Sequence, residues 1–149
     1  MEMIAVPNIV DAQALVDWFG YWPSFHDAEI LELVLRTGKP SILKLHAWEM
    51  LKELTEEGFY AQGKNCIVTF SLIDVFETSL EDFYSHQNVL LSLSIERNTY
   101  GWTIDLIAAN GLGGRLVAKE VWVEFEPGKP DVLEAEREHS PRSGPAAPL

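Results

Sequence analysis

Apolar residues recur at helical spacing in one segment near the start of the chain. From Asn8 or Asp11 to about Phe19, the apolar positions fall three and four residues apart, which is the spacing of one helix face. The residues on this face are Leu15, Trp18 and Phe19. Asn8 or Asp11 can cap the start of the helix, and Gly20 can end it. One helix of this length is not stable alone, so we expect its apolar face to pack on a sheet.

The rest of the chain largely alternates between apolar and polar residues, which predicts strands with one buried face. The predicted strands cover residues 28–36, 41–48, 65–75, 89–95, 102–108 and 120–125. Their expected core faces are Leu31, Leu33 and Leu35; Leu43, Leu45 and Ala47; Cys66, Val68, Phe70 and Leu72; Val89, Leu91, Leu93 and Ile95; Trp102, Ile104, Leu106 and Ala108; and Val121, Val123 and Phe125. Short connections join these strands, and residues 110–114 are a strong hairpin signal, so we expect an antiparallel meander.

Two segments leave alternatives open. Residues 49–58 would suit a helical turn, yet an irregular acidic loop fits the same residues equally well. Residues 76–83 either continue the preceding strand after a bulge or form a short connector.

The fold class that follows is α+β, with an N-terminal helix packed on a curved, mainly antiparallel meander sheet of about six strands. With 149 residues the chain has the length of one domain, which we place at residues 1–126. From residue 127 onward Pro, Gly, Ser, Ala and charged residues dominate, and the apolar periodicity ends. Residues 127–149 are therefore predicted to form a disordered tail.

The formal charge of −12, from 23 acidic against 11 basic residues, is the unusual feature of the composition. Nucleic acids and anionic membranes are bound through basic surfaces, so neither is an expected partner. A basic protein is the natural macromolecular partner, although acidity that only aids solubility fits the composition as well. The acids concentrate in two stretches, Glu49, Glu53, Glu56 and Glu57, and then Asp74, Glu77, Glu81 and Asp82.

The single cysteine, Cys66, permits no disulfide within the chain and lies in an apolar strand. We interpret it as a small core residue in a reducing compartment. The sequence has neither the basic and then apolar pattern of a signal peptide nor an apolar run of about 18 residues. We therefore expect a cytoplasmic protein.

The linker between the predicted helix and the first strand concentrates aromatic and ionisable side chains. Pro23 fixes its own φ, so the chain leaves the helix at this point. Period 2 counted back from the strand puts Asp27 and Glu29 on the face of Leu31, with His26 on the opposite face. In the structural interpretation, Asp27 accepts backbone N–H bonds where the linker enters the sheet. The alternative is that Asp27 and Glu29 form an acid–base pair.

The residues of this linker do not favour a metal site or a catalytic nucleophile. Adjacent residues of an extended chain point to opposite faces, so one metal ion could not easily bind both His26 and Asp27. Ser24 lacks a nucleophile elbow and is interpreted as a turn residue. We therefore predict no catalytic residue, no metal and no cofactor.

The segment Trp22-Pro23-Ser24-Phe25-His26-Asp27-Ala28-Glu29, followed by Ile30-Leu31 and an alternating strand, resembles the immunity protein 50 family of bacterial polymorphic-toxin systems. The strand Val68-Thr69-Phe70 and the run Asn88-Val89-Leu90 are similar to the strand pattern of the same family. The resemblance covers residues 15–125, and its Phe-His-Asp-Ala-Glu core is the distinctive part. It implies a non-enzymatic antitoxin that binds and neutralises a cognate bacterial toxin domain, which we expect to be basic.

These patterns predict one group of partner-binding residues and one group of structural residues. Tyr21 and Trp22 lie outside the helical periodicity and are expected to be partly exposed, as interface anchors often are. The expected partner-binding residues are Tyr21, Trp22, His26, Glu53 and Glu56. The expected structural residues are Pro23, Phe25, Asp27 and Glu29. The alternative function is a small ligand-binding protein or hydrolase that uses His26, Asp27 and Glu29, and a third is a plain structural subunit.

Overall fold

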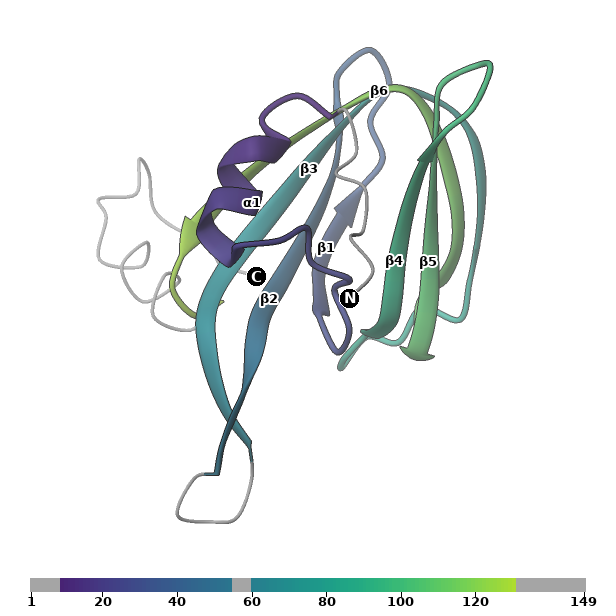
Figure 1. Cartoon of the computed structure of the whole chain (residues 1–149). Coiled ribbons are helices and arrows are strands. Elements are labelled where there is room, and N and C mark those ends of the chain that lie inside the picture. Colours follow the sequence, from purple (N-terminus) through teal and green to yellow (C-terminus); the bar gives the residue numbers. More distant parts are fainter. Residues whose placement is uncertain (1–8, 55–59, 131–149) are drawn as a thin grey trace, which may run out of the picture.

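The computed structural model describes residues 9–54 and 60–130, with side chains described outside residues 50–62. Within these residues the chain forms one helix and six strands (Figure 1). In chain order they are α1 (Ala12–Phe19), β1 (Glu29–Val34), β2 (Ser41–Leu54), β3 (Tyr60–Glu81), β4 (Val89–Arg97), β5 (Trp102–Asn110) and β6 (Gly113–Pro127). All pairs of named strands are antiparallel, which confirms the predicted α+β fold with an N-terminal helix and a six-strand antiparallel sheet. Most of the predicted tail, residues 131–149, lies outside the described residues.

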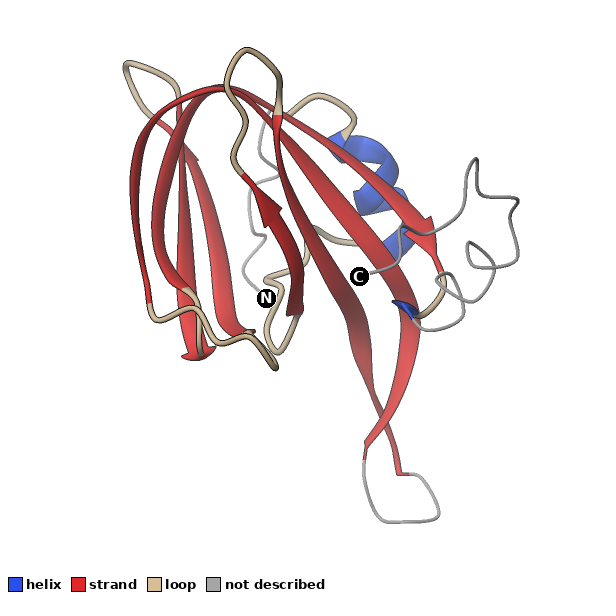
Figure 2. Cartoon of the chain, turned by 180° about the vertical axis from the view of Figure 1, so that it is seen from behind, coloured by secondary structure: helices blue, strands red, loops and turns tan. Residues whose placement is uncertain are grey.

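The strand order is β1-β2-β3-β6-β5-β4, and the sheet closes on itself through one pair, Glu29 of β1 with Val89 of β4. This order differs from the predicted meander because β3 pairs with β6 along most of its length and does not pair with β4. The two long strands arch together, with a register shift between Val75 and Glu77 (Figure 2). The arch carries the end of β3 away from β2, and the β4–β5 hairpin adds to β6 there.

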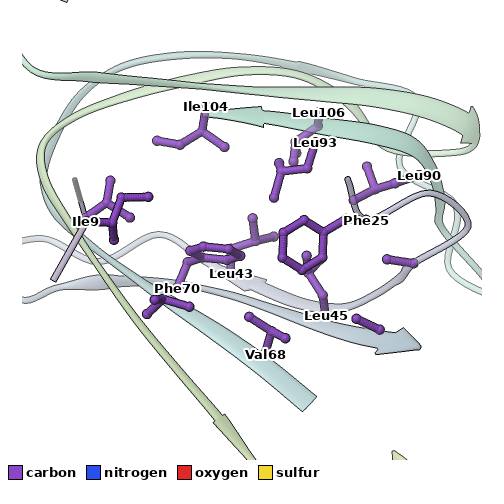
Figure 3. Packing of buried hydrophobic residues seen from close by; sticks show 14 of the residues in the cluster. Ile9, Phe25, Leu43, Leu45, Val68, Phe70, Leu90, Leu93, Ile104 and Leu106 are labelled. Carbon is purple, nitrogen blue, oxygen red and sulfur yellow. The ribbon is translucent and has the colours of Figure 1, made fainter. Parts of the chain in front are cut away.

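The core lies between the inner faces of the strands and the helix (Figure 3). The predicted core faces of β2, β3 and β6 are confirmed, since their residues are buried or packed against the core. On the helix, Leu15 and Phe19 are buried as predicted. Trp18 packs against Phe125 of β6, with 5.6 Å between the ring centroids.

The ends of α1 lie close to the predicted ones. Asp11 precedes the first helical residue, but its carboxylate makes no capping bond, and the Ala12 N–H donates to the carbonyl of Ile9 at 3.1 Å instead. Gly20 ends the helix with φ 87°, a left-handed conformation that glycine adopts without steric cost. No helix in the described part of the chain is long and apolar enough to cross a membrane.

Two β-bulges make the predicted core faces of β1 and β4 wrong in part. The register shifts between Ile30 and Glu32 in β1, and again between Leu90 and Ser92 in β4. A bulge inserts one residue and exchanges the two faces of the strand beyond it. At the bulges Ile30 and Leu90 are buried and the predicted core residues Leu31 and Leu91 are exposed, whereas beyond them Leu33, Leu93 and Ile95 pack in the core as predicted. The predicted core residues Leu35, which follows β1, and Ala108 of β5 are exposed.

The strands β2 and β3 are longer than predicted and form a hairpin that extends past the other strands (Figure 1). Residues 49–54 continue β2, so neither the helical turn nor the irregular loop describes them. Residues 55–59 lie outside the described residues. At the other end of β3, residues 76–81 continue the strand after a bulge, which confirms one of the two alternatives.

Cys66 should react with thiol reagents only when the chain unfolds. The side chain is fully buried, and burial raises the pKa of its thiol from 9.0 to about 12, with the Trp18 indole opposing part of the shift. The pKa is higher in the folded state than in the unfolded state. Burial of the neutral thiol therefore contributes fully to the stability of the fold below pH 9.0, and this contribution is lost as the pH rises towards about 12. At pH 8 we expect native labelling at least ~1,000-fold slower than labelling in urea. Comparable rates in the two conditions would contradict this burial.

Candidate functional site

The linker between α1 and β1 is held by backbone hydrogen bonds to β4. The Asp27 N–H donates to the Leu90 carbonyl at 2.9 Å, and the Leu90 N–H donates to the Ala28 carbonyl at 2.8 Å. The Leu93 N–H donates to the Ser24 carbonyl at 3.1 Å. The linker therefore lies along β4 as an N-terminal continuation of β1.

Two residues of the linker have left-handed backbone conformations, with φ 60° at Phe25 and 65° at Asp27. The turn between them closes through a bond from the Ala28 N–H to the Phe25 carbonyl at 3.1 Å. It directs the Phe25 side chain into the core, among the residues labelled in Figure 3. The Phe25 ring lies edge-on to those of Phe70 and Trp22, with centroid distances of 5.7 and 6.0 Å.

The burial of Trp22 corrects the expectation that it is a partly exposed anchor. Only 6% of its surface is exposed, because its ring packs against Phe25 at the edge of the core. Tyr21, by contrast, is 47% exposed, as predicted. Of the two aromatic residues, only Tyr21 is available to a partner in this conformation.

The carboxylate of Asp27 does not have the structural contacts that we expected. It is 39% exposed and lies 3.1 Å from Nδ1 of His26, whose side chain is also exposed. No backbone N–H of the described residues donates to this carboxylate. The backbone N–H of Asp27 instead makes the bond to β4, so this position holds the linker through its main chain.

A hollow of about 290 Å³ lies between the linker and the start of the extended β2–β3 hairpin. Its lining includes Tyr21, His26 and Asp27 from the linker and Trp48 and Glu49 from β2. The pKa of Tyr21 is raised, mainly by partial burial and then by the Glu49 carboxylate. The sequence-predicted residues Tyr21 and His26 therefore share one surface.

The ion pair at the edge of this hollow connects the hairpin to the helix. Lys64 of β3 lies 3.7 Å from the Glu49 carboxylate and also donates to the Phe19 carbonyl at 3.1 Å, at the end of α1. Of the two other predicted contact residues, Glu53 lies in β2, where only the backbone is described, and Glu56 lies outside the described residues.

A second and larger hollow, about 760 Å³, lies between β1 and the connection from β3 to β4. We call it the acidic groove. Its acidic lining residues are Glu29, Glu32, Glu81 and Asp82, and its exposed or partly exposed apolar ones are Leu31, Leu33, Leu35, Leu80 and Phe83. Among the described residues no lysine or arginine lines the groove. Lys44 lies 3.8 Å from Glu32 but lines a different hollow, on the outer face of the sheet.

The separation of Glu29 from Asp27 bears on the alternative function. Glu29 lines the acidic groove, whereas Asp27 lines the hollow beside the linker. The two carboxylates do not converge in one hollow, as an acid–base pair acting on one substrate would need. The described residues also contain no group of three or more His, Cys, Asp and Glu placed to hold a metal ion.

Comparison of the chain with protein-family models, with curated proteins and with solved structures returned no match. The resemblance of residues 22–29 to an immunity-protein family therefore stays a hypothesis.

Proposed function

We propose that the protein is a non-enzymatic immunity protein that binds and neutralises a cognate, basic toxin domain. The observation that carries this proposal is the acidic groove, where four carboxylates surround exposed apolar side chains and no lysine or arginine is present among the described lining residues. Apolar surface provides affinity, and an excess of negative charge selects a partner of the opposite sign.

The groove leaves large apolar side chains exposed. Phe83 is 66% exposed and Leu35 is 50% exposed, and both line the groove together with Leu31. Large apolar side chains gathered in one concave, charge-rimmed surface are typical of interaction sites. A partner that covered them would gain the free energy of burying this area, which is about 25 cal/mol for each Å².

The chemistry of the linker supports binding rather than catalysis. The His26 and Asp27 side chains contact one another in an exposed position, and the Ser24 hydroxyl accepts a bond from the His26 N–H at 3.3 Å. The linker therefore supplies Tyr21 and His26 as polar contact residues at a second surface. The hollow beside the linker is lined by linker residues up to Ala28, and the lining of the acidic groove begins at the next residue, Glu29.

Neutralising the groove should slow association with the toxin domain encoded by a neighbouring gene. The double variant Glu81→Gln/Asp82→Asn removes two rim charges, and asparagine tolerates the left-handed conformation at position 82, where φ is 62°. We expect the association rate at low salt to fall about three- to tenfold, because steering by the groove is weakened. Stopped-flow fluorescence measures this rate, and added salt should reduce the difference.

The matched control is Glu120→Gln/Glu124→Gln, which removes the same charge from exposed positions of β6 that do not line the groove. Its association rate should stay close to that of the unmodified protein. Equal losses in both double variants would mean that net charge, not the groove, attracts the partner. Failure of the unmodified protein to bind and inhibit the toxin domain would refute the immunity function itself.

A further inference from the structure

The edge of β1 that faces the acidic groove is largely unpaired. On its other side β1 pairs with β2 from Glu29 to Val34. Towards β4 it makes the Glu29–Val89 pair and one bond from the Ile30 N–H to the Asn88 carbonyl at 2.8 Å. Beyond Ile30 the described residues supply no further backbone partner on this side, and β1 and β4 diverge (Figure 2).

The register explains why the two strands do not pair further. Glu29 lies opposite Val89, so in this antiparallel register the residues of β1 beyond Ile30 lie opposite residues before Asn88, in the connection that precedes β4. The backbone groups of β4 at Leu90 and Leu93 bond to linker residues 24–28, on the N-terminal side of β1. The sheet therefore closes at one pair of residues and leaves the remainder of β1 as an edge inside a groove. Sheet edges in stable proteins are usually short, covered or protected by lysine or proline, because free N–H and C=O groups recruit other strands.

The walls of the groove indicate what could pair with this edge. Leu31 of β1 and Leu35, just after its end, are exposed in the lining, and Phe83 lines the groove from the connection that follows β3. The carboxylates of Glu81 and Asp82 lie on that same wall. An extended segment has side chains that alternate between two faces, so apolar residues can contact the leucines while the residues between them reach the rim.

We propose that the edge of β1 binds an extended segment of the partner, with lysine or arginine alternating with apolar residues, as an added strand. This inference depends on the proposed function, because it names how the toxin domain would engage the groove. The backbone of the added strand satisfies the edge from Leu31 to Val34, and its basic side chains face the rim carboxylates. Affinity comes from the backbone bonds and apolar contacts, and sequence selection comes from charge.

The test uses the full chain and a fluorescein-labelled peptide of eight residues in which valine alternates with lysine. Anisotropy should report binding, and a peptide of alternating valine and glutamate should not bind. The double variant Glu81→Gln/Asp82→Asn should weaken binding of the basic peptide about tenfold, since two favourable charge pairs are lost. The control Glu120→Gln/Glu124→Gln should leave the affinity unchanged.

Hydrogen exchange distinguishes strand addition from simple attraction of charges. Saturating basic peptide should slow amide exchange in residues 31–34 at least about tenfold, because the exposed N–H groups become bonded. Binding without this protection, equal affinity for the acidic peptide, or no binding up to about 1 mM peptide would each overturn the proposal. Light scattering that shows a dimer of the chain, with residues 31–34 protected without peptide, would overturn it in favour of a second copy as the occupant.

The two proposals fail separately. If the toxin domain is bound and inhibited while residues 31–34 stay unprotected, the protein is an immunity protein that uses another contact. If the basic peptide slows amide exchange in residues 31–34 but no toxin domain is inhibited, strand addition is supported and the immunity function is refuted.

Discussion

Replacing Phe25 with alanine should lower the free energy of unfolding by about 3–5 kcal/mol, the range for removing a buried aromatic ring. The ring is almost fully buried and lies edge-on to Trp22 and Phe70. Its loss would leave a cavity between the linker and the sheet, where the neighbouring strands are fixed and cannot collapse. Urea denaturation followed by circular dichroism measures the change, and an unchanged m value would show that folding stays cooperative.

The matched control for this variant is Tyr21→Ala, which removes a ring of similar size from the same linker. Because Tyr21 is about half exposed, we expect a cost below about 1 kcal/mol. A loss of less than 1 kcal/mol for Phe25→Ala, or equal losses at the two positions, would contradict the role of Phe25 as the residue that fastens the linker to the core.

The periodicity of the sequence predicts the fold where strands run without interruption. In β2 and the first half of β3, period 2 holds over many residues, so Leu43, Leu45, Val68 and Phe70 could all be assigned to the core. Gly20 likewise marks the helix end because its left-handed φ favours glycine. These features depend on residues that are neighbours in the sequence, and local patterns are sufficient for them.

Bulges and distant pairings limit the prediction elsewhere. One extra residue at Ile30–Glu32 exchanges the faces of β1, and a bulge has no residue type that reveals it in alternating leucines. The pairing of β3 with β6 joins residues that are 32 positions apart at Glu81–Gly113 and 61 apart at Cys66–Pro127, whereas turn signals report only on adjacent strands. For this reason the sequence suggested a meander and did not suggest closure.

The same limits apply to the candidate sites. Tyr21, His26 and Asp27 could be grouped from the sequence because they are neighbours along one linker. Glu81 and Asp82 were recognised as acidic, but their approach to β1 depends on where the arch of β3 and β6 ends. The sequence pattern does not distinguish Tyr21 from Trp22, whereas in the fold Trp22 is buried beside Phe25 and Tyr21 is exposed.

Replacing Asn88 with alanine should cost about 2–4 kcal/mol, because buried hydrogen-bonding groups would lose their partners. The Asn88 side chain is buried and joins two separate segments. Its Oδ1 accepts from the N–H groups of Tyr84 and Leu112, at 3.0 and 2.8 Å, and its Nδ2 donates to the Tyr84 carbonyl at 2.7 Å. The connection from β3 to β4 is thereby fastened to the turn between β5 and β6, next to the acidic groove.

The chain supplies a close control for this variant in Asn98, whose side chain also makes three hydrogen bonds, to Thr103, Tyr100 and Gly101. These bonds lie in an exposed turn, where water replaces them, so Asn98→Ala should cost about 0.5–1 kcal/mol. Asn88→Asp keeps the acceptor but loses the donor to Tyr84, and its cost should fall between the two. If both alanine variants had the same unfolding free energy, burial would not explain the role of Asn88. If the expected order is found, the buried hydrogen bonds of Asn88 stabilise this wall of the groove in the free protein.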